Sequence, residues 1–184
     1  MSTLIANTLQ GVNTIKRDAS TTAMTIDSSG IINPKGCAFY MWQNTAQSVS
    51  DVTETQIQFQ VELFDTHGGV VNLAQNRVDF PSGTEGIWYI SFTWRLNSTV
   101  PFRHIAYVNK NSTSSSGGSE YLKFENVQYS QTTGASSSVN ANGLISLAAG
   151  DYLTFTGYHG YGSARNTSAG RADTYASGFR VSSN

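Results

Sequence analysis

Few side chains in this sequence have the spacing that a catalytic or metal-binding motif requires. Histidine, which suits acid–base and metal chemistry, occurs three times, as His67, His104 and His159. None of them belongs to an H-E-x-x-H zinc motif, and no C-x-x-C pair, G-x-S-x-G nucleophile turn or phosphate-binding glycine loop is present. The motifs therefore predict no catalytic residue, no cofactor and no metal ligand.

Glycoside hydrolysis stays open as an alternative, because it needs only two carboxylates that meet in space. The candidates lie beside predicted turns, where Asp and Glu are also ordinary turn residues, and they are Asp65, Asp79, Glu85 and Asp151. Asp151 could also be an oxygen ligand of Ca²⁺. We expect turn and surface roles for these groups, and so a protein that is not an enzyme.

The segment Gly157-Tyr-His-Gly-Tyr161 is the most distinctive local cluster. One interpretation is an exposed platform for sugar rings or an interface, formed by Tyr158, His159 and Tyr161, with Arg165 and Arg171 able to meet anionic groups. The other is a strand end whose tyrosines pack within the fold or between subunits, which base rates of burial favour. His104 is expected as a packed or surface histidine at a strand edge.

Two segments alternate apolar and polar residues, as half-buried antiparallel strands do. In Gln56–Leu63, the residues Ile57, Phe59, Val61 and Leu63 share the apolar face. In Ile87–Leu96, one face holds Trp88, Ile90, Phe92, Trp94 and Leu96, and the other holds Tyr89, Ser91, Thr93 and Arg95. Neither pattern gives a helix one apolar stripe.

Shorter strands are predicted at His104–Val108, Tyr121–Val127, Gly143–Leu147, Tyr152–Gly157 and Ser177–Val181. Turn residues such as Asp27-Ser-Ser-Gly30 and Asn142-Gly143 separate the strands. Polar loops are expected at 112–119 and 160–170. Many short strands without an amphipathic helix predict an antiparallel two-sheet sandwich, jelly roll or barrel.

Composition limits the partners that the chain can have. The formal net charge is -1 and only 12% of the residues are charged, so no strong field would attract nucleic acid or an anionic membrane. No apolar run approaches the roughly 20 residues of a membrane-spanning helix, and no secretory signal pattern opens the chain. Cys37, the single cysteine, is expected as a small buried side chain, with an interchain or reactive thiol as the alternative.

Residues 1–35 differ from residues 36–184 because they hold short β-prone pieces and almost no aromatic residues. The pieces are 3–7, 13–16 and 23–26, and they are too thin to bury a core alone. We predict an attachment or stalk segment at 1–35 and a head at 36–184, with a partly disordered tail as the alternative.

The middle of the chain resembles the globular head of the C1q family, a branch of the tumour-necrosis-factor-like jelly rolls. Leu73, Phe80, Gly86 and Phe92 match the family signature, Trp88 and Ile90 stand where Tyr and Phe are usual, and Gly68 departs from it. Leu147-Ala-Ala-Gly-Asp-Tyr-Leu153 and Ala176-Ser-Gly-Phe179 resemble two later family segments. The resemblance covers about Gly36 to Val181 and implies a trimeric jelly-roll head.

The opening segment is similar to the N-terminus of virion fibre proteins of tailed bacteriophages, through Asn7–Ile15 and Thr25–Gly30. This resemblance implies a virion protein, made in a host cytoplasm, that docks on other virion proteins through residues 1–35. Its head would contact a host-surface glycan or an envelope protein through the loops at 112–119 and 160–170. The alternatives are a purely structural decoration or joint and a non-viral secreted or spore-surface head.

Aromatic residues exceed what one sandwich core can hold, and the surplus would seek cover at a three-fold axis. The candidates for trimer or core contacts are Tyr40, Trp42, Trp88, Phe92, Tyr107 and Phe179, and Tyr121, Tyr129 and Tyr175 belong to the same surplus.

Overall fold

The computed structural model describes residues 14–16, 22–26, 32–34, 36–97, 102–115, 120–128 and 136–183, and the chain divides into two compact units, Met1–Gly36 and Cys37–Asn184. Its regular elements are strands, apart from one 3-10 turn at Leu73–Gln75. The all-β prediction is confirmed. No helix in these ranges has the length and apolar character needed to cross a membrane.

In the first unit, three short strands form an antiparallel sheet with β2 in the middle. They are β1 (Thr14–Lys16), β2 (Thr22–Ile26) and β3 (Ile32–Pro34). The β-prone piece predicted at 3–7 lies outside the described residues. Strands this short give little surface for independent stability, and the attachment role of residues 1–35 stays a prediction.

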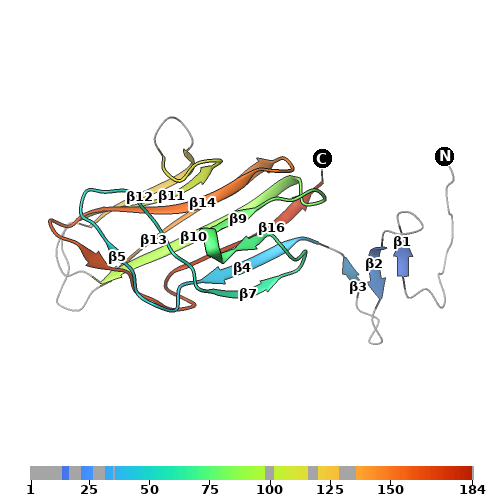
Figure 1. The fold of residues 1–184 in the computed structure, drawn as a ribbon, viewed down its shortest axis with the longest axis horizontal. Helices are drawn as coiled ribbons and strands as arrows, with labels where there is room; N and C mark the ends of the chain where they lie inside the picture. The colour runs from blue at the N-terminus through green and yellow to red at the C-terminus, as the bar shows by residue number, and fades with distance from the viewer. Residues whose placement is uncertain are drawn as a thin grey trace. The chain divides into compact units, whose positions relative to one another are not determined.

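The second unit is a jelly-roll sandwich of two antiparallel sheets (Figure 1). The five-stranded sheet has the order β13-β10-β16-β4-β7, and the six-stranded sheet has the order β12-β11-β14-β9-β8 with β6 paired to β14. A small pair, β5 and β15, stands apart. The bounds are β4 (Ala38–Trp42), β5 (Ser48–Val49), β6 (Thr55–Gln56), β7 (Val61–Asp65), β8 (Val71–Asn72), β9 (Arg77–Asp79), β10 (Gly86–Asn97), β11 (Phe102–Lys110), β12 (Glu120–Gln128), β13 (Ser136–Leu147), β14 (Tyr152–Gly160), β15 (Arg165–Asn166) and β16 (Tyr175–Ser182).

Strand β10 supplies the largest share of the core, as its alternation predicts. Trp88, Ile90, Phe92, Trp94 and Leu96 are all fully buried. The indole of Trp94 crosses to the other sheet, where its Nε1 donates to the carbonyl oxygen of Ile105 at 3.0 Å. Burying one such side chain stabilises the fold by roughly 1.5–3 kcal/mol, so this one strand accounts for much of the driving force.

The segment Gln56–Leu63 is not the single strand that its alternation predicts. It begins in β6, which pairs with β14, and ends in β7, which pairs with β4 of the other sheet. Ile57 and Phe59 are buried as expected, and the Phe59 ring lies edge-on to Phe155 at 5.8 Å. Leu63, by contrast, is 42% exposed. A chain that changes sheets loses the common face on which the pattern argument depends.

The two ends of the sandwich carry different loops. Residue pairings place Gly86, Leu147 and Ser182 at the end that holds Ala38, here called the Ala38 end. They place Asn97, Ser136 and Tyr175 at the opposite end, here called the Trp42 end. Because Gly160 pairs with Arg103 and Leu153 pairs with Lys110, the loops predicted at 112–119 and 160–170 leave opposite ends of the β11–β14 ladder.

Gly157 marks a close approach between the two sheets. A Cβ atom there would lie 2.6 Å from the Trp94 ring, whereas one at Gly160, in the same strand, would meet only the Cβ of Arg103 at 3.9 Å. We expect Gly157→Ala to lower the free energy of unfolding by about 1–3 kcal/mol, because the indole must move. Urea denaturation measures the loss. Gly160→Ala is the control, and equal stability of the two variants would contradict this packing.

Candidate functional site

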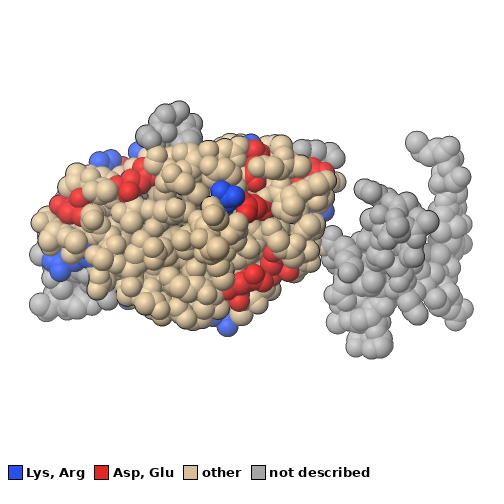
Figure 2. Space-filling view, viewed as in Figure 1, with Lys and Arg blue, Asp and Glu red and all other residues tan. Residues whose placement is uncertain are grey.

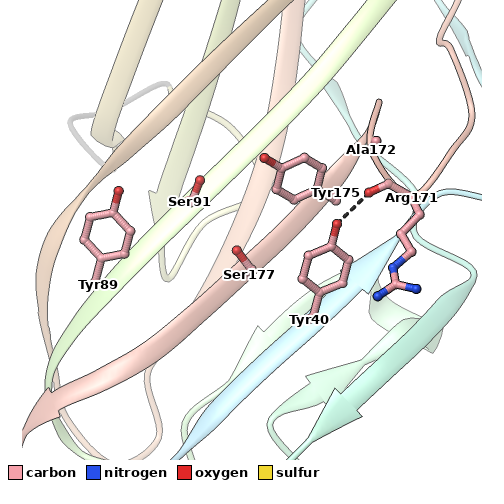
Figure 3. Close-up of a pocket in the computed structure, with 7 residues that line it drawn as sticks. All are labelled: Tyr40, Tyr89, Ser91, Arg171, Ala172, Tyr175 and Ser177. Atoms are coloured by element: carbon pink, nitrogen blue, oxygen red, sulfur yellow. Dashed lines mark hydrogen bonds between the residues drawn. The ribbon is translucent and has the colours of Figure 1, made fainter.

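A shallow hollow lies on the outer side of the five-stranded sheet, the side turned away from the core. Its volume is about 680 Å³, and its lining is aromatic and hydroxyl-bearing, with Arg171 as the only charged member: Tyr40, Tyr89, Ser91, Arg171, Ala172, Tyr175 and Ser177. Figure 3 shows Tyr40 and Tyr175 next to each other, with Tyr89 farther along the sheet. Strands β4, β10 and β16 supply all of these residues except Arg171 and Ala172.

The rings of this outer side contact one another. Tyr40 stacks on Tyr175 with 5.3 Å between centroids, and Tyr89 lies 5.5 Å from Phe179. The Tyr40 hydroxyl donates to the carbonyl oxygen of Arg171 at 2.5 Å. Burial, and next the neighbouring Tyr175, raise the pKa of Tyr40, so the phenol stays neutral. Apart from Arg171, the hollow is thus an uncharged aromatic surface whose rings contact one another.

Large apolar side chains extend this surface along the sheet. Phe64, Ile87, Leu144 and Phe179 are 39–59% exposed, and their strand positions place them on the same side as Tyr40 and Tyr89. Proteins rarely leave several large apolar side chains on one sheet surface exposed to water, and exposed apolar patches mark interaction surfaces. We call these four residues, together with Tyr40, Tyr89 and Tyr175, the outer aromatic face.

Four tyrosines elsewhere in the second unit have a different environment, because each lies under a basic side chain. The pairs and their distances from cation to ring centroid are Arg77 over Tyr152 (4.4 Å), Arg103 over Tyr158 (5.5 Å), Lys123 over Tyr107 (5.5 Å) and Arg165 over Tyr161 (3.6 Å). Such pairs suit a solvated surface. Charged side chains form small groups in the view of Figure 2, with uncharged surface between them.

The six aromatic residues predicted for trimer or core contacts separate into three environments. Trp88 and Phe92 are fully buried in the core. Tyr107 lies on the outer side of the six-stranded sheet and is 8% exposed. Tyr40, Trp42 and Phe179 lie on the outer side of the five-stranded sheet. Tyr129 falls outside the described residues.

Sequence reasoning missed Tyr89, Ile87 and Leu144 as members of the outer aromatic face. A signal for Ile87 and Tyr89 was present, because the second face of Ile87–Leu96 begins with these two residues and not with charged ones. Leu144 follows the Asn142-Gly143 pair, which the residue types predict as a turn but which lies inside the long strand β13. The sequence of β13 shows no clear alternation of apolar and polar residues, because Ser and Asn occupy much of the strand.

The predicted ligand cluster is a strand end and not a loop tip. Residues 157–160 belong to β14, and the His159 ring is fully buried, with Nε2 3.0 Å from the carbonyl oxygen of Val49. Tyr158 and Tyr161 are half-buried, with the Arg103 side chain over the Tyr158 ring and the Arg165 side chain over the Tyr161 ring. Arg165 is half-buried too. The interpretation of His159 as part of an exposed platform is therefore wrong. Its side chain is buried and contacts the backbone of Val49 instead.

His104 and His159 are paired residues of neighbouring strands, and both rings lie in the core. The Trp94 ring packs edge-on against His104 at 4.1 Å, and the His104 Nδ1 is 3.0 Å from the Ser137 hydroxyl. Burial, and next the nearby His159, lower the pKa of His104 to about 3. Of the two roles expected for His104, packed or surface, the structure confirms the packed one.

The four carboxylates named as hydrolase candidates each have a structural role. Asp65 accepts four backbone N–H groups, and these outweigh burial and lower its pKa. Backbone N–H groups also lower the pKa of Glu85, and Lys110 with Asn111 lowers that of Asp151 against the effect of burial. Asp79 pairs with Arg77 at 2.7 Å. The general acid of a glycoside hydrolase needs a raised pKa, whereas the pKa values of Asp65, Glu85 and Asp151 are lowered.

Within the described ranges, no three His, Cys, Asp or Glu side chains are grouped to hold a metal ion.

The buried His104 predicts that acid weakens the fold. Its pKa falls from the usual 6.5 to about 3, so between these values the unfolded chain binds a proton that the folded chain excludes. Stability present above pH 6.5 is lost as the pH falls. We expect a loss of roughly 2 kcal/mol from pH 7 to pH 5, measured by urea denaturation, and a smaller loss in His104→Gln. His67→Gln is the control, and unchanged acid sensitivity in His104→Gln would contradict this assignment.

Comparisons with known proteins support the fold alone. No family model matches the chain, and no curated protein matches it. Among solved structures, Eiger TNF from S. frugiperda is 11% identical with a TM-score of 0.62, covering 82% of this chain and 95% of that one. Murine APRIL is 17% identical with a TM-score of 0.58, covering 80% and 100%. The globular domain of zebrafish complement 1qA protein is 15% identical with a TM-score of 0.56, covering 81% and 99%. The second unit therefore has the jelly-roll fold that TNF and C1q domains share.

Proposed function

We propose that this chain is the subunit of a homotrimeric, non-enzymatic head on a virion fibre. In this proposal residues 1–35 attach to other virion proteins, and the second unit contacts the host surface. The observation that carries self-association is the outer aromatic face, where apolar rings and aliphatic side chains stand exposed on a regular sheet.

A second copy of the chain is the occupant that best suits this face. Each square ångström of apolar surface removed from water contributes about 25 cal/mol, so covering the face is favourable. The hollow is almost uncharged and its rings are already ordered by stacking, which lowers the entropy lost on association. Interface cores are depleted of charge and enriched in Tyr and Phe in the same way.

A second exposed apolar side chain, on the edge strand β12, favours a ring over a two-fold dimer. Phe124 is 49% exposed there, and Tyr121, which is 44% exposed, lies on the opposite side of the same strand. Phe124 pairs with the buried Ala106, so its ring emerges at the open side of the sandwich. Two dissimilar surfaces on one chain can make a head-to-tail contact, and such contacts form a cyclic ring when the rotation between copies closes. The resemblance of the sequence to C1q heads indicates three copies.

The virion role rests on the sequence resemblance of Asn7–Ile15 and Thr25–Gly30 to phage fibre N-termini. The thin antiparallel sheet of the first unit is compatible with it, because strands of three to five residues gain stability from partner chains. The non-enzymatic role is supported by the carboxylates and histidines, which the fold uses for turns, ion pairs and core packing.

A charged residue on the outer aromatic face should separate the subunits. Phe179 is half exposed in the single chain, so Phe179→Asp should fold, yet it places an unpaired charge in the proposed interface. We expect the variant to be monomeric by size-exclusion chromatography with light scattering, while its far-UV circular dichroism is retained. Thr113→Asp, in an exposed loop, is the control and should remain a trimer. A Phe179→Asp chain that keeps its oligomeric mass would contradict the proposed surface.

Host contact is tested by adsorption. The labelled full chain should bind the isolated envelopes of at least one species in a panel of bacteria, and three linked copies should bind more tightly than the Phe179→Asp monomer through avidity. Sedimentation of the envelopes measures the bound fraction. A trimer that binds no envelope would leave the purely structural decoration or joint as the function.

A further inference from the structure

The strand pairing of the first unit sorts its residues onto two unlike sides of the sheet. Directly paired residues of antiparallel strands share one side, and so do residues two apart within a strand. By this rule one side holds five apolar residues, which we call the apolar side of the first unit: Ile15, Met24, Ile26, Ile32 and Pro34. The three strands contain one other apolar residue, Ala23.

The opposite side of the same sheet is polar. By the same pairings it holds Thr14, Thr25 and Asn33. The pairing of β1 with β2 skips Ala23 at a bulge, and Lys16 and Thr22 pair beyond it, at the end of the sheet. Such a division over three strands is typical of a sheet with one solvated and one covered side.

The apolar side needs a second layer that these strands do not provide. Each strand has only three to five residues, and within the described residues of the first unit they form a single sheet. An isolated sheet of this size is marginally stable in water, and its apolar side gains stability when another layer packs on it. The second layer must therefore come from outside these three strands.

Further copies of the first unit are the partners that the chain connection favours. Only residues 35–37 separate β3 from β4, so the chain can span at most about 14 Å between Pro34 and Ala38. In the proposed homotrimer, the heads would thus tether three first units at an effective concentration on the order of millimolar. Association between them costs less translational freedom than the capture of a separate protein.

The chemistry of the apolar side also suits copies of itself. None of its five residues is charged, so identical sheets can face one another without bringing like charges together. Three sheets arranged around a three-fold axis would enclose an apolar core that a single sheet cannot form. The same arrangement leaves the polar side of each sheet in water.

We infer that the apolar sides of three copies meet at the three-fold axis and form the core of a stalk, with Thr14, Thr25 and Asn33 on its outside. This inference rests on the proposed homotrimer. It leaves the polar side of the first unit for contact with other virion proteins.

The test compares the wild-type chain with Ile26→Asp and with the control Thr25→Asp, which alters the polar side of the same strand. Trypsin can cut after Lys16 and Arg17, and mass spectrometry follows the rate of this cleavage. We expect Ile26→Asp to raise the rate at least about tenfold, because a charge in the stalk core opens it and cleavage follows the opened fraction. Thr25→Asp should stay within about twofold of wild type. Light scattering should give a trimer for all three chains, because their heads are unchanged.

Two further experiments identify what covers the apolar side. The Phe179→Asp chain, which should be monomeric, should lose the protection from trypsin although its first unit is unaltered. In the purified chain, irradiation of Met24→p-benzoylphenylalanine should join copies into covalent dimers and trimers, and Thr25→p-benzoylphenylalanine should join far fewer.

Several results would overturn the inference. Equal cleavage of Ile26→Asp and a trimeric wild type would remove the stalk core and leave the trimeric head standing. A Phe179→Asp monomer that stays protected would show that its own chain covers the apolar side. Irradiation that joins no copies of the purified trimer would exclude packing between first units. A monomeric wild-type chain would remove the proposed homotrimer and this inference together.

Discussion

The structure depends on how strand β10 divides its side chains between two environments. Trp88, Ile90, Phe92, Trp94 and Leu96 close the core against the six-stranded sheet, and Gly157 leaves room for the Trp94 indole. The opposite side of the same strand carries Ile87 and Tyr89, which face away from any layer of their own chain. A two-layer sandwich has no third layer, so the second side must face water or another molecule.

The outer sides of the two sheets differ in the side chains that they carry. On the six-stranded sheet, basic side chains lie over the tyrosines, and the loop at 111–115 is bound to Glu54 through Ser115. On the five-stranded sheet, rings stack on rings and the lining of the hollow is almost free of charge. Tyr107 and Tyr152 of the first surface are therefore covered within the chain, whereas the second surface keeps Phe64, Leu144 and Phe179 exposed. This difference is the physical basis for assigning self-association to the five-stranded sheet.

Much of the fold follows from local pattern, and the site follows only in part. The alternation of Ile87–Leu96 predicts β10 because a strand that stays in one sheet keeps its two sides distinct. The same argument fails for Gln56–Leu63, where the chain passes from β6 to β7 and changes sheets. His159 is misplaced for a related reason, since a partner distant in sequence, Val49, decides whether a strand end is buried. Tyr40 and Phe179 could be named from composition, but their meeting with Tyr89 depends on pairing between strands far apart in sequence. The solved structures with this fold are only 11–17% identical to this chain, so they indicate its layers and not the residues on its surface.

The central claim is that the outer aromatic face is covered by further copies of the same chain. The most direct measurement is the mass of the purified 184-residue chain in solution, by sedimentation equilibrium over a range of concentrations. The account predicts a single species of three times the 19.9 kDa chain mass that persists on dilution. A species of one chain mass at all concentrations would contradict it.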